Sequence, residues 1–397
     1  MKFFEKGELR ELWPFYIERF IAHILFFAPA FWTLQLQQNF TLFNIGVLWA
    51  VYSITAFVFE VPTGAVADIY GRKFSTLVGY LVCGISLIGL FFSSQFALSL
   101  VFFFLWAVGG TFISGAMDAW IVDRLKARRK SKLITDYYIK NHSLIGFGLF
   151  FSGFLGAYLV TKTGLNIIWM FAGLSFLVTF FILVFLKEYK VTKEKPESFG
   201  HIFVQAKKAI KYSMGHHVLM LLIFANFFAM LREAFGGDIV WQPFLRNLGL
   251  ADYKFGLLFS GIAILGAVAP LFAKMLLGRF KNEKNYLAFL ILMAIVLDVS
   301  VILVGRLPLG IAIFLAMFVV MGLFAPIYMG YFQKHIPSKM RATVISFNSM
   351  ITSLSFVISF VLAGFFADLV GVQWTIALGA IFLVPAFFLY LKIKEKR

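Results

Sequence analysis

The sequence predicts an all-α polytopic membrane protein with twelve transmembrane helices in two pseudo-symmetric six-helix bundles. Of its 397 residues, 61% are hydrophobic and only 14% are charged, whereas a soluble domain has about 45–50% and about 25%. Long apolar runs recur at lengths near the roughly 20 residues that a helix needs to cross a bilayer. Lys and Arg gather in alternate connections between these runs.

Twelve apolar runs define the expected spans. Their hydrophobicity is continuous rather than alternating, which excludes the strand pattern of a membrane barrel. The runs cover residues 13–36, 42–67, 75–94, 96–122, 137–161, 164–187, 217–245, 253–278, 285–304, 308–331, 342–367 and 373–391.

The positive charges predict the orientation of these spans. With the N-terminus inside, 29 of the 36 Lys and Arg lie in inner segments, 4 in outer segments and 3 within spans. Because inner loops carry the excess of Lys and Arg, we expect both termini to be cytoplasmic and the protein to lie in the inner cell membrane. The same rule explains the net charge of +17 without a nucleic-acid partner.

The domain organisation follows from the longest connection, 188–215, which comes after the sixth span. It divides the chain into bundles at 1–187 and 216–397, and its segment "HIFVQAKKAIKY" predicts an amphipathic helix along the inner membrane surface. The halves repeat, since Trp32 corresponds to Trp241 and Gly46 to Gly256. Duplicated halves are typical of transporters whose site lies between them.

The connection between the second and third spans carries a motif. Gly64, Asp68, Gly71, Arg72 and Lys73 form "GxxxDxxGRK", which resembles the loop signature of the major facilitator superfamily. With the twelve spans and duplicated halves, the resemblance covers the whole chain. The stretches "FEVPTG" and "SGAMDAWIVD" are similar to a bacterial, drug-efflux-like branch of unassigned substrate.

The resemblance implies a latch on the inner gate. Asp68 would meet the N-terminus of the eleventh helix near Arg341, where a helix dipole favours an anion. Arg72 would pair with Asp123, and both contacts would hold the inner side closed while the protein opens outward. From the residues themselves, Gly71 permits a tight turn and Gly64 allows close helix approach. The alternative is that the acid and the two cations only set topology.

Charged and polar side chains within spans are the candidates for the substrate cavity, because such groups are costly in a membrane and usually functional. Structural readings stay open for the neighbouring pairs Glu18 with Arg19 and Arg232 with Glu233, which can simply neutralise one another. Asp298 has no evident partner. The cavity candidates are Arg19, His23, Trp32, His142, Asn226, Arg232, Glu233, Asp238, Asn348 and Thr352.

Glu60 is the first candidate for proton coupling. A carboxyl group buried without a fixed cation favours its protonated form, and neither Glu60 nor Asp118 has a cation four residues away on its own helix. We therefore expect Glu60 to carry the proton and to exchange it with Asp118. A Glu60 locked to Arg19 is the structural alternative, and His23 and Glu233 are the next candidates.

These features predict a secondary transporter that works by alternating access, with protons driving export of an amphipathic or drug-like solute as an antiporter. Proton-coupled uptake of a nutrient or metabolite is the alternative, and a receptor or membrane enzyme without flux is the alternative of another class. The sequence shows no catalytic motif, so we expect no enzyme activity, no cofactor and no metal. The expected partners are a small solute, protons and the lipid bilayer, and we expect a monomer.

Overall fold

The computed structural model describes residues 4–5, 7–188, 215–337 and 341–394, except for the side chains at positions 238, 342 and 343. Every regular element in this part of the chain is helical, as the fold class requires. The predicted amphipathic segment within 188–215 and the side chain of Asp238 lie outside the described residues.

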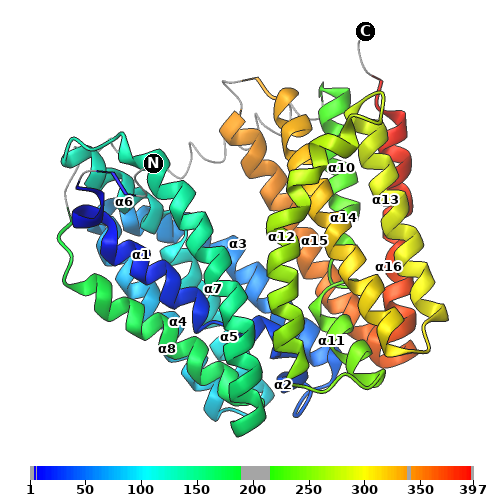
Figure 1. The fold of residues 1–397 in the computed structure, drawn as a ribbon, viewed down its shortest axis with the longest axis horizontal. Coiled ribbons are helices and arrows are strands. Elements are labelled where there is room, and N and C mark those ends of the chain that lie inside the picture. The colour runs from blue at the N-terminus through cyan, green and yellow to red at the C-terminus, as the bar shows by residue number, and fades with distance from the viewer. Residues whose placement is uncertain (1–3, 6, 189–214, 338–340, 395–397) are drawn as a thin grey trace. The chain divides into compact units, whose positions relative to one another are not determined.

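The first half of the chain forms the helices that precede the long central connection (Figure 1). In order, they are α1 (Glu8–Ile24), η1 (Ala28–Ala30), α2 (Trp32–Leu36), α3 (Leu42–Tyr70), α4 (Arg72–Phe92), α5 (Phe96–Ile113), α6 (Ala116–Ala127), α7 (Leu133–Thr163) and α8 (Ile167–Val184).

The second half repeats this series after the central connection. Its helices are α10 (His217–Leu231), α11 (Asp238–Asn247), α12 (Lys254–Leu277), α13 (Glu283–Ser300), η2 (Val301–Leu303), α14 (Leu307–Lys334), α15 (Arg341–Val370) and α16 (Val372–Lys392).

Ten helical stretches of the described chain are long and apolar enough to cross a membrane. The other two predicted spans, 13–36 and 217–245, are each broken into two pieces, α1 with α2 and α10 with α11. The first break contains Pro29 and the second contains Gly236 and Gly237, residue types that interrupt a helix. Together these stretches account for the twelve predicted crossings.

A third break lies inside the span predicted at 96–122. The helix α5 stops at Ile113 and α6 starts at Ala116, although the apolar run continues. Gly115 takes a φ of +68° at the break, a left-handed conformation that glycine adopts without steric cost. The predicted span is therefore present, but two helical pieces cross it rather than one.

The two halves pack their helices in the same pairwise pattern. In the first half, α4 packs against α5 and α8, and α1 packs against α7 and α8. In the second half, the helices at the same places in the order do the same, with α13 against α14 and α16 and α10 against α15 and α16. Figure 1 shows α13 and α16 side by side. The repeated packing agrees with the duplication inferred from the sequence.

The chain nevertheless divides into compact units that do not follow the midpoint of the sequence. The first unit contains residues 1–35, 51–196 and 252–263, and the second contains 36–50, 197–251 and 264–397. The start of α3 thus packs within the second unit and the start of α12 within the first. The simple boundaries at 187 and 216 stay a prediction for the two bundles.

Glycines make two contacts possible, that of the start of α3 with α15 and that of the start of α12 with α7. A Cβ added to Gly46 of α3 would lie 2.2 Å from the carbonyl oxygen of Phe360 on α15, and a Cβ added to Gly256 of α12 would lie 2.3 Å from that of Gly153 on α7. Such distances leave no room for a side chain, so small residues let the helix backbones approach closely. The two glycines paired by the sequence repeat therefore occupy equivalent contacts.

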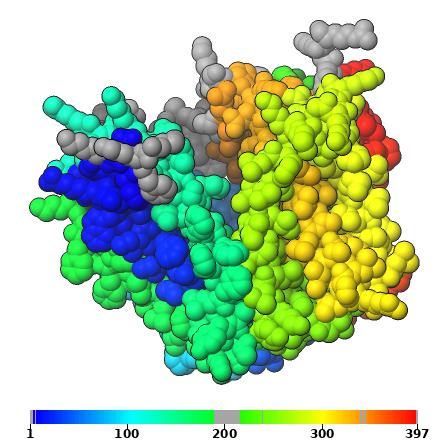
Figure 2. All heavy atoms as spheres, viewed as in Figure 1, coloured from blue at the N-terminus to red at the C-terminus, as the bar shows by residue number. Residues whose placement is uncertain are grey.

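The outer faces of the helices are apolar. On α7 the side chains of Phe147, Phe151, Phe154 and Tyr158 are 47–63% exposed and recur at helical spacing. The space-filling view shows side chains of α7 on the visible face of the first unit, and those of α13 and α14 on that of the second (Figure 2). Such surfaces suit the hydrocarbon core of a bilayer.

Candidate functional site

The break in the fourth span contacts Glu60 and lies four residues before Asp118. At the end of α5, the hydroxyl of Ser114 donates a hydrogen bond to Oε1 of Glu60 at 3.0 Å. Four residues later, Asp118 lies in the first turn of α6, where the helix dipole favours a negative charge. The two acids predicted to exchange a proton therefore flank one short non-helical link.

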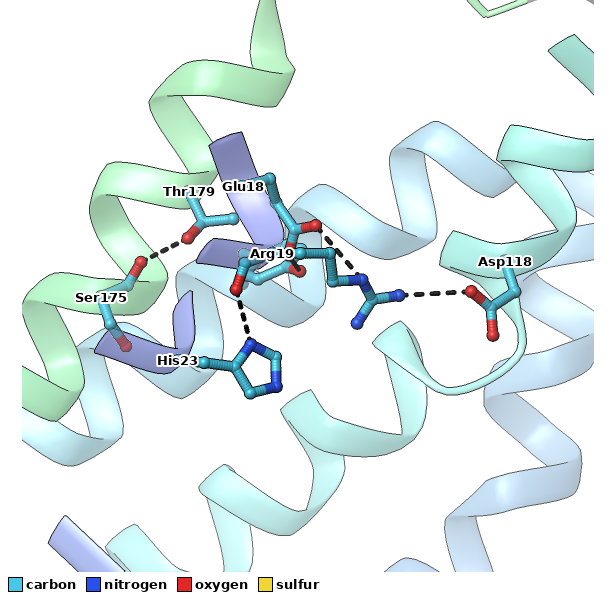
Figure 3. A network of polar contacts seen from close by, with 7 residues as sticks. Glu18, Arg19, His23, Asp118, Ser175 and Thr179 are labelled. Atoms are coloured by element: carbon cyan, nitrogen blue, oxygen red, sulfur yellow. Dashed lines mark hydrogen bonds and ion pairs between the residues drawn. The ribbon is translucent and has the colours of Figure 1, made fainter. Parts of the chain in front are cut away.

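Arg19 of α1 lies between two carboxylates (Figure 3). Its Nε is 3.4 Å from Oε2 of Glu18, and its Nη2 is 3.2 Å from Oδ1 of Asp118. The Glu18 side chain is fully buried, whereas the Asp118 side chain is 50% exposed. The Arg19 guanidinium thus pairs with a buried acid, Glu18, and with an acid that water can reach, Asp118.

The buried acid is held by two helices. The hydroxyl of Tyr80 on α4 donates to Oε1 of Glu18 at 2.5 Å. One turn along α1, Nδ1 of His23 lies 2.6 Å from the carbonyl oxygen of Arg19, so Nδ1 carries the hydrogen and donates it. Figure 3 shows the His23 ring beside the ion pairs. The contacts of Tyr80 and Arg19 fix Glu18, whereas Asp118 has more freedom to change partners.

The structure corrects two points of the proton hypothesis. Asp118 was expected to be unpaired, but it forms an ion pair with Arg19 across 99 residues of sequence. Glu60 was expected to be buried, but it is exposed and bonds to Ser114. Arg19 pairs with Glu18 and Asp118, whereas Glu60 bonds to Ser114, which contradicts the alternative of a Glu60 locked to Arg19.

An aromatic cluster adjoins the charged network in the first unit. The rings of Tyr52 and Trp106 are 4.8 Å apart, and Phe26 packs against Trp106 and Phe176 with centroid distances of 6.4 and 5.9 Å. Phe176 also contacts the ring of Tyr80 at 5.7 Å, the residue that donates to Glu18. Aromatic side chains and ion pairs therefore lie next to one another in this part of the first unit.

The second unit holds its own buried ion pair at the break of the seventh span. Nε and Nη2 of Arg232 donate to the two carboxylate oxygens of Asp298 on α13, at 2.8 and 2.5 Å, and both residues are buried. Asp298 had no evident partner in the sequence analysis, and mutual neutralisation of Arg232 and Glu233 was one of the readings left open. The bidentate contact shows that Asp298 neutralises Arg232 instead.

Polar residues on α15 support this break and the helix before it. Ser359 donates to the carbonyl oxygen of Leu231 and accepts from the backbone amide of Ala234, which replaces helical bonds lost at the interruption. Nearer the start of α15, the amide of Asn226 lies 3.4 Å from Asn348 and 3.0 Å from Thr352. The structure therefore groups three of the predicted cavity residues.

The remaining cavity candidates lie elsewhere. His142 is exposed on α7, and Trp32 lies partly buried in α2. Glu233 lies in the turn after α10, directly beside Arg232.

The gate motif is tied to two other helices of the first unit. Nε of Arg72 is 3.1 Å from Oδ2 of Asp123 on α6, so the predicted ion pair is present. Nζ of Lys73 donates to the carbonyl oxygen of Val184 at the end of α8. Both cations therefore hold the start of α4 to its neighbours, whereas their role as a latch stays a prediction.

Glu188 is a member of this cluster that the sequence analysis missed. Its Oε1 accepts the backbone amides of Arg72 at 2.6 Å and Lys73 at 3.1 Å, so it caps the N-terminus of α4. A Cβ on Gly71 would lie 2.7 Å from Glu188 Oε2, and Gly71 has a φ of +114°. The motif thus requires glycine here for its conformation and for the space that Glu188 occupies.

The other gate residues give a mixed result. Asp68 at the end of α3 and Arg341 at the start of α15 are both exposed. A Cβ added to Gly64 would meet no described atom within 4 Å. The close helix approach expected at Gly64 is therefore not made in the described part of the chain.

The sequence profile of the Major Facilitator Superfamily matches residues 16–235 and 221–397. The chain therefore belongs to this superfamily of membrane transporters. It is 27% identical over 386 residues to the uncharacterized MFS-type transporter YxaM of Bacillus subtilis (strain 168), and the match covers 93% of this chain and 92% of that protein.

Solved structures share the fold at low sequence identity. The nucleoside transporter NupG matches with a TM-score of 0.80 and 15% identity, over 96% of this chain and 99% of that one. A bacterial homologue of the iron transporter ferroportin in an inward-facing state matches with a TM-score of 0.73 and 14% identity, over 97% and 98%. Since these named substrates differ, the fold similarity carries no substrate assignment.

Proposed function

We propose that this chain is a proton-coupled secondary transporter that exports a small amphipathic solute by alternating access. The observation that carries the proposal is the link between Glu60 and Asp118 through the break at Ser114 and Gly115, with Arg19 bound to Asp118. Two acids that differ in pairing, at one interruption of a membrane helix, suit a site that loads and releases a proton.

Arg19 provides the means of coupling. While its guanidinium lies beside Asp118, that carboxylate has a cation to pair with. When Arg19 turns fully to the buried Glu18, Asp118 loses its cation and takes a proton, which Glu60 delivers from its exposed position. A solute that competes for Arg19 or Asp118 shifts this balance, as coupling requires.

The aromatic cluster supports the choice of an amphipathic solute. Tyr52 and Phe26 are partly exposed and pack on the buried Trp106 beside a charged network, so a solute with an apolar body and a polar end can contact both. The Asn226, Asn348 and Thr352 group supplies further hydrogen-bonding capacity in the second unit.

Reconstituted vesicles with a pH gradient provide the test. The probes are fluorescent amphipathic dyes of cationic, neutral and anionic type, and dye movement and internal pH are recorded together. We expect dye movement coupled to opposite proton movement. Coupled movement in the same direction would establish the uptake alternative, and no movement of any dye or proton would contradict transport of this class of solute.

Substitutions locate the proton pathway. We expect Glu60→Gln to abolish accumulation against a gradient while downhill exchange continues, and Asp118→Asn to reduce accumulation less. Asp136→Asn, at the start of α7, is the matched acid control and should behave as the unchanged protein. Normal pH-dependent accumulation by Glu60→Gln would show that the proton travels by another route, with His23 and Glu233 as the next residues to replace.

A further inference from the structure

The gate motif has a second copy at the end of α15. The sequence "GAVADIYG" at 64–71 is matched by "GFFADLVG" at 364–371, both of the form G-x-x-A-D-x-x-G. Each copy ends a long helix, and each final glycine has a positive φ, +114° at Gly71 and +85° at Gly371. The two copies therefore have the same local structure, with an acid three residues before the glycine.

The acid of the second copy caps another helix. Oδ1 of Asp368 accepts the backbone amide of Leu42 at 3.0 Å, and Oδ2 accepts that of Phe43 at 2.8 Å. These are the first two residues of α3, where helical amides lack partners within the helix and the dipole favours an anion. Thr41 satisfies the next amide, that of Asn44, so the start of α3 is fully capped.

The backbones of α3 and α15 are close enough to make this cap specific. A Cβ on Gly364 would lie 2.4 Å from the carbonyl oxygen of Leu42, and one on Gly46 would lie 2.2 Å from that of Phe360. The ring of Trp49 stacks on that of Phe360 at a centroid distance of 6.0 Å. The glycine of the motif thus sets the distance at which its own carboxylate reaches the helix end.

We propose that Asp368 is an outer latch, the counterpart of the inner latch expected at Asp68. The two helices run in opposite directions across the membrane by the predicted topology, so the carboxyl end of each lies on the same side as the amino end of the other. The Asp68 copy is predicted to cap α15 on the inner side, and the Asp368 copy caps α3 on the outer side. Opening outward requires release of Asp368, and opening inward requires release of Asp68.

This inference rests on alternating access within the proposed function, but its test needs no solute and no proton gradient. Spin-label pairs report the two faces, Gln95 with Arg306 on the predicted outer side and Lys126 with Lys281 on the predicted inner side, in a protein with Cys83 replaced. A negative result in the flux assay would therefore leave the label distances as a test of the latch, and unchanged label distances would leave the flux assay as a test of transport.

We expect Asp368→Ala to raise the ratio of outward-open to outward-closed molecules about fivefold. A change of this size corresponds to the free energy that one helix cap contributes. The isosteric Asp368→Asn keeps one acceptor oxygen and serves as the second variant if Asp368→Ala does not fold. It should give a smaller change in the same direction. Asp68→Asn should shift both label pairs in the opposite direction. The proposal is overturned if the Asp368 variants leave the outer distances unchanged, or shift them as Asp68→Asn does.

Discussion

At the residue scale, the buried pair of Arg232 and Asp298 permits a direct measurement of what an ion pair contributes here. Replacing Arg232 with Leu leaves the Asp298 carboxylate buried without its cation, and breaking such a pair costs about 3–5 kcal/mol. The double variant Arg232→Leu with Asp298→Leu removes both charges and should recover most of this loss. Denaturant titration in micelles gives the free energies of unfolding; equal values for single and double variants would contradict the pairing.

Glu8 near the start of α1 makes stability depend on pH. Burial raises the pKa of its carboxyl, but hydrogen bonds from Lys140 at 2.5 and 2.7 Å and from Tyr16 at 2.7 Å outweigh burial and leave the pKa below its ordinary value. A carboxyl with a pKa lower in the folded than in the unfolded chain stabilises above its unfolded pKa, about 4.3. This stabilisation is lost as pH falls through the folded pKa.

We therefore expect the apparent Tm of the unchanged protein to fall between pH 6 and pH 3 by a few degrees more than that of Glu8→Gln. The comparison removes the contribution of every other acid, because both proteins share them. If the Tm of the two proteins fell in parallel over this pH range, Glu8 would not be the cause of the pH dependence of stability.

The sequence analysis could single out individual residues but not most of their contacts. Intramembrane charge alone pointed to Arg19, Asp118 and Arg232, because such residues are rare in an apolar span. The partner of Arg232 is 66 residues away on another helix, and periodicity within one helix says nothing of such a pairing. Glu188 was overlooked since it lies in a charged stretch that resembles an ordinary solvated loop.

At the element scale, the approach of α12 to α7 depends on glycine. A Cβ on Gly256 would lie 2.3 Å from the carbonyl oxygen of Gly153, whereas one on Gly261 of the same helix would meet no described atom within 4 Å. We expect Gly256→Ala to destabilise the protein by about 1–3 kcal/mol through overpacking. Gly261→Ala is the matched control and should be neutral or slightly stabilising.

Thermal unfolding of the two glycine variants side by side checks this expectation. If both alanines had the same small effect, the packing of α12 on α7 would not depend on the close backbone approach. Retained stability with slowed transport in Gly256→Ala would instead assign the contact to motion between states.

Helix number followed from hydropathy, but helix continuity did not. The runs 13–36, 96–122 and 217–245 are predominantly apolar and give no signal of interruption at the level of composition. The signals were local, in Pro29, the Ser114–Gly115 pair and the Gly236–Gly237 pair, which are residues that mark turns. In membrane helices, neighbouring side chains such as Ser359 can satisfy the freed backbone groups, so such residues do not alone decide where a helix stops.

At the scale of the whole molecule, the charge asymmetry predicts the orientation in the membrane. Of the Lys and Arg residues, 29 lie in predicted inner segments and 4 in outer ones, so both termini and the connection at 188–215 should be cytoplasmic. A cysteine placed at Ser198 should resist an impermeant thiol reagent in intact cells and react after permeabilisation. A cysteine at Gln95 is the outward control, and Cys83 is replaced first; labelling at Ser198 in intact cells would reverse the topology.

The start of α3 packs within the second unit and the start of α12 within the first. These contacts determine when the packing of each unit can be completed during synthesis. The contact between Gly153 of α7 and α12 cannot form until Gly256 has been synthesised. Elongation from Gly153 to Gly256 takes about 5–20 s at about 5–20 residues per second. The amides of Leu42 and Phe43 wait longer, because Asp368 follows Leu42 by 326 residues, about 16–65 s of elongation. The newly inserted first half must therefore persist in the bilayer without the contact at Gly153 and without a cap on the amides of Leu42 and Phe43, until α12 and then α15 have been made.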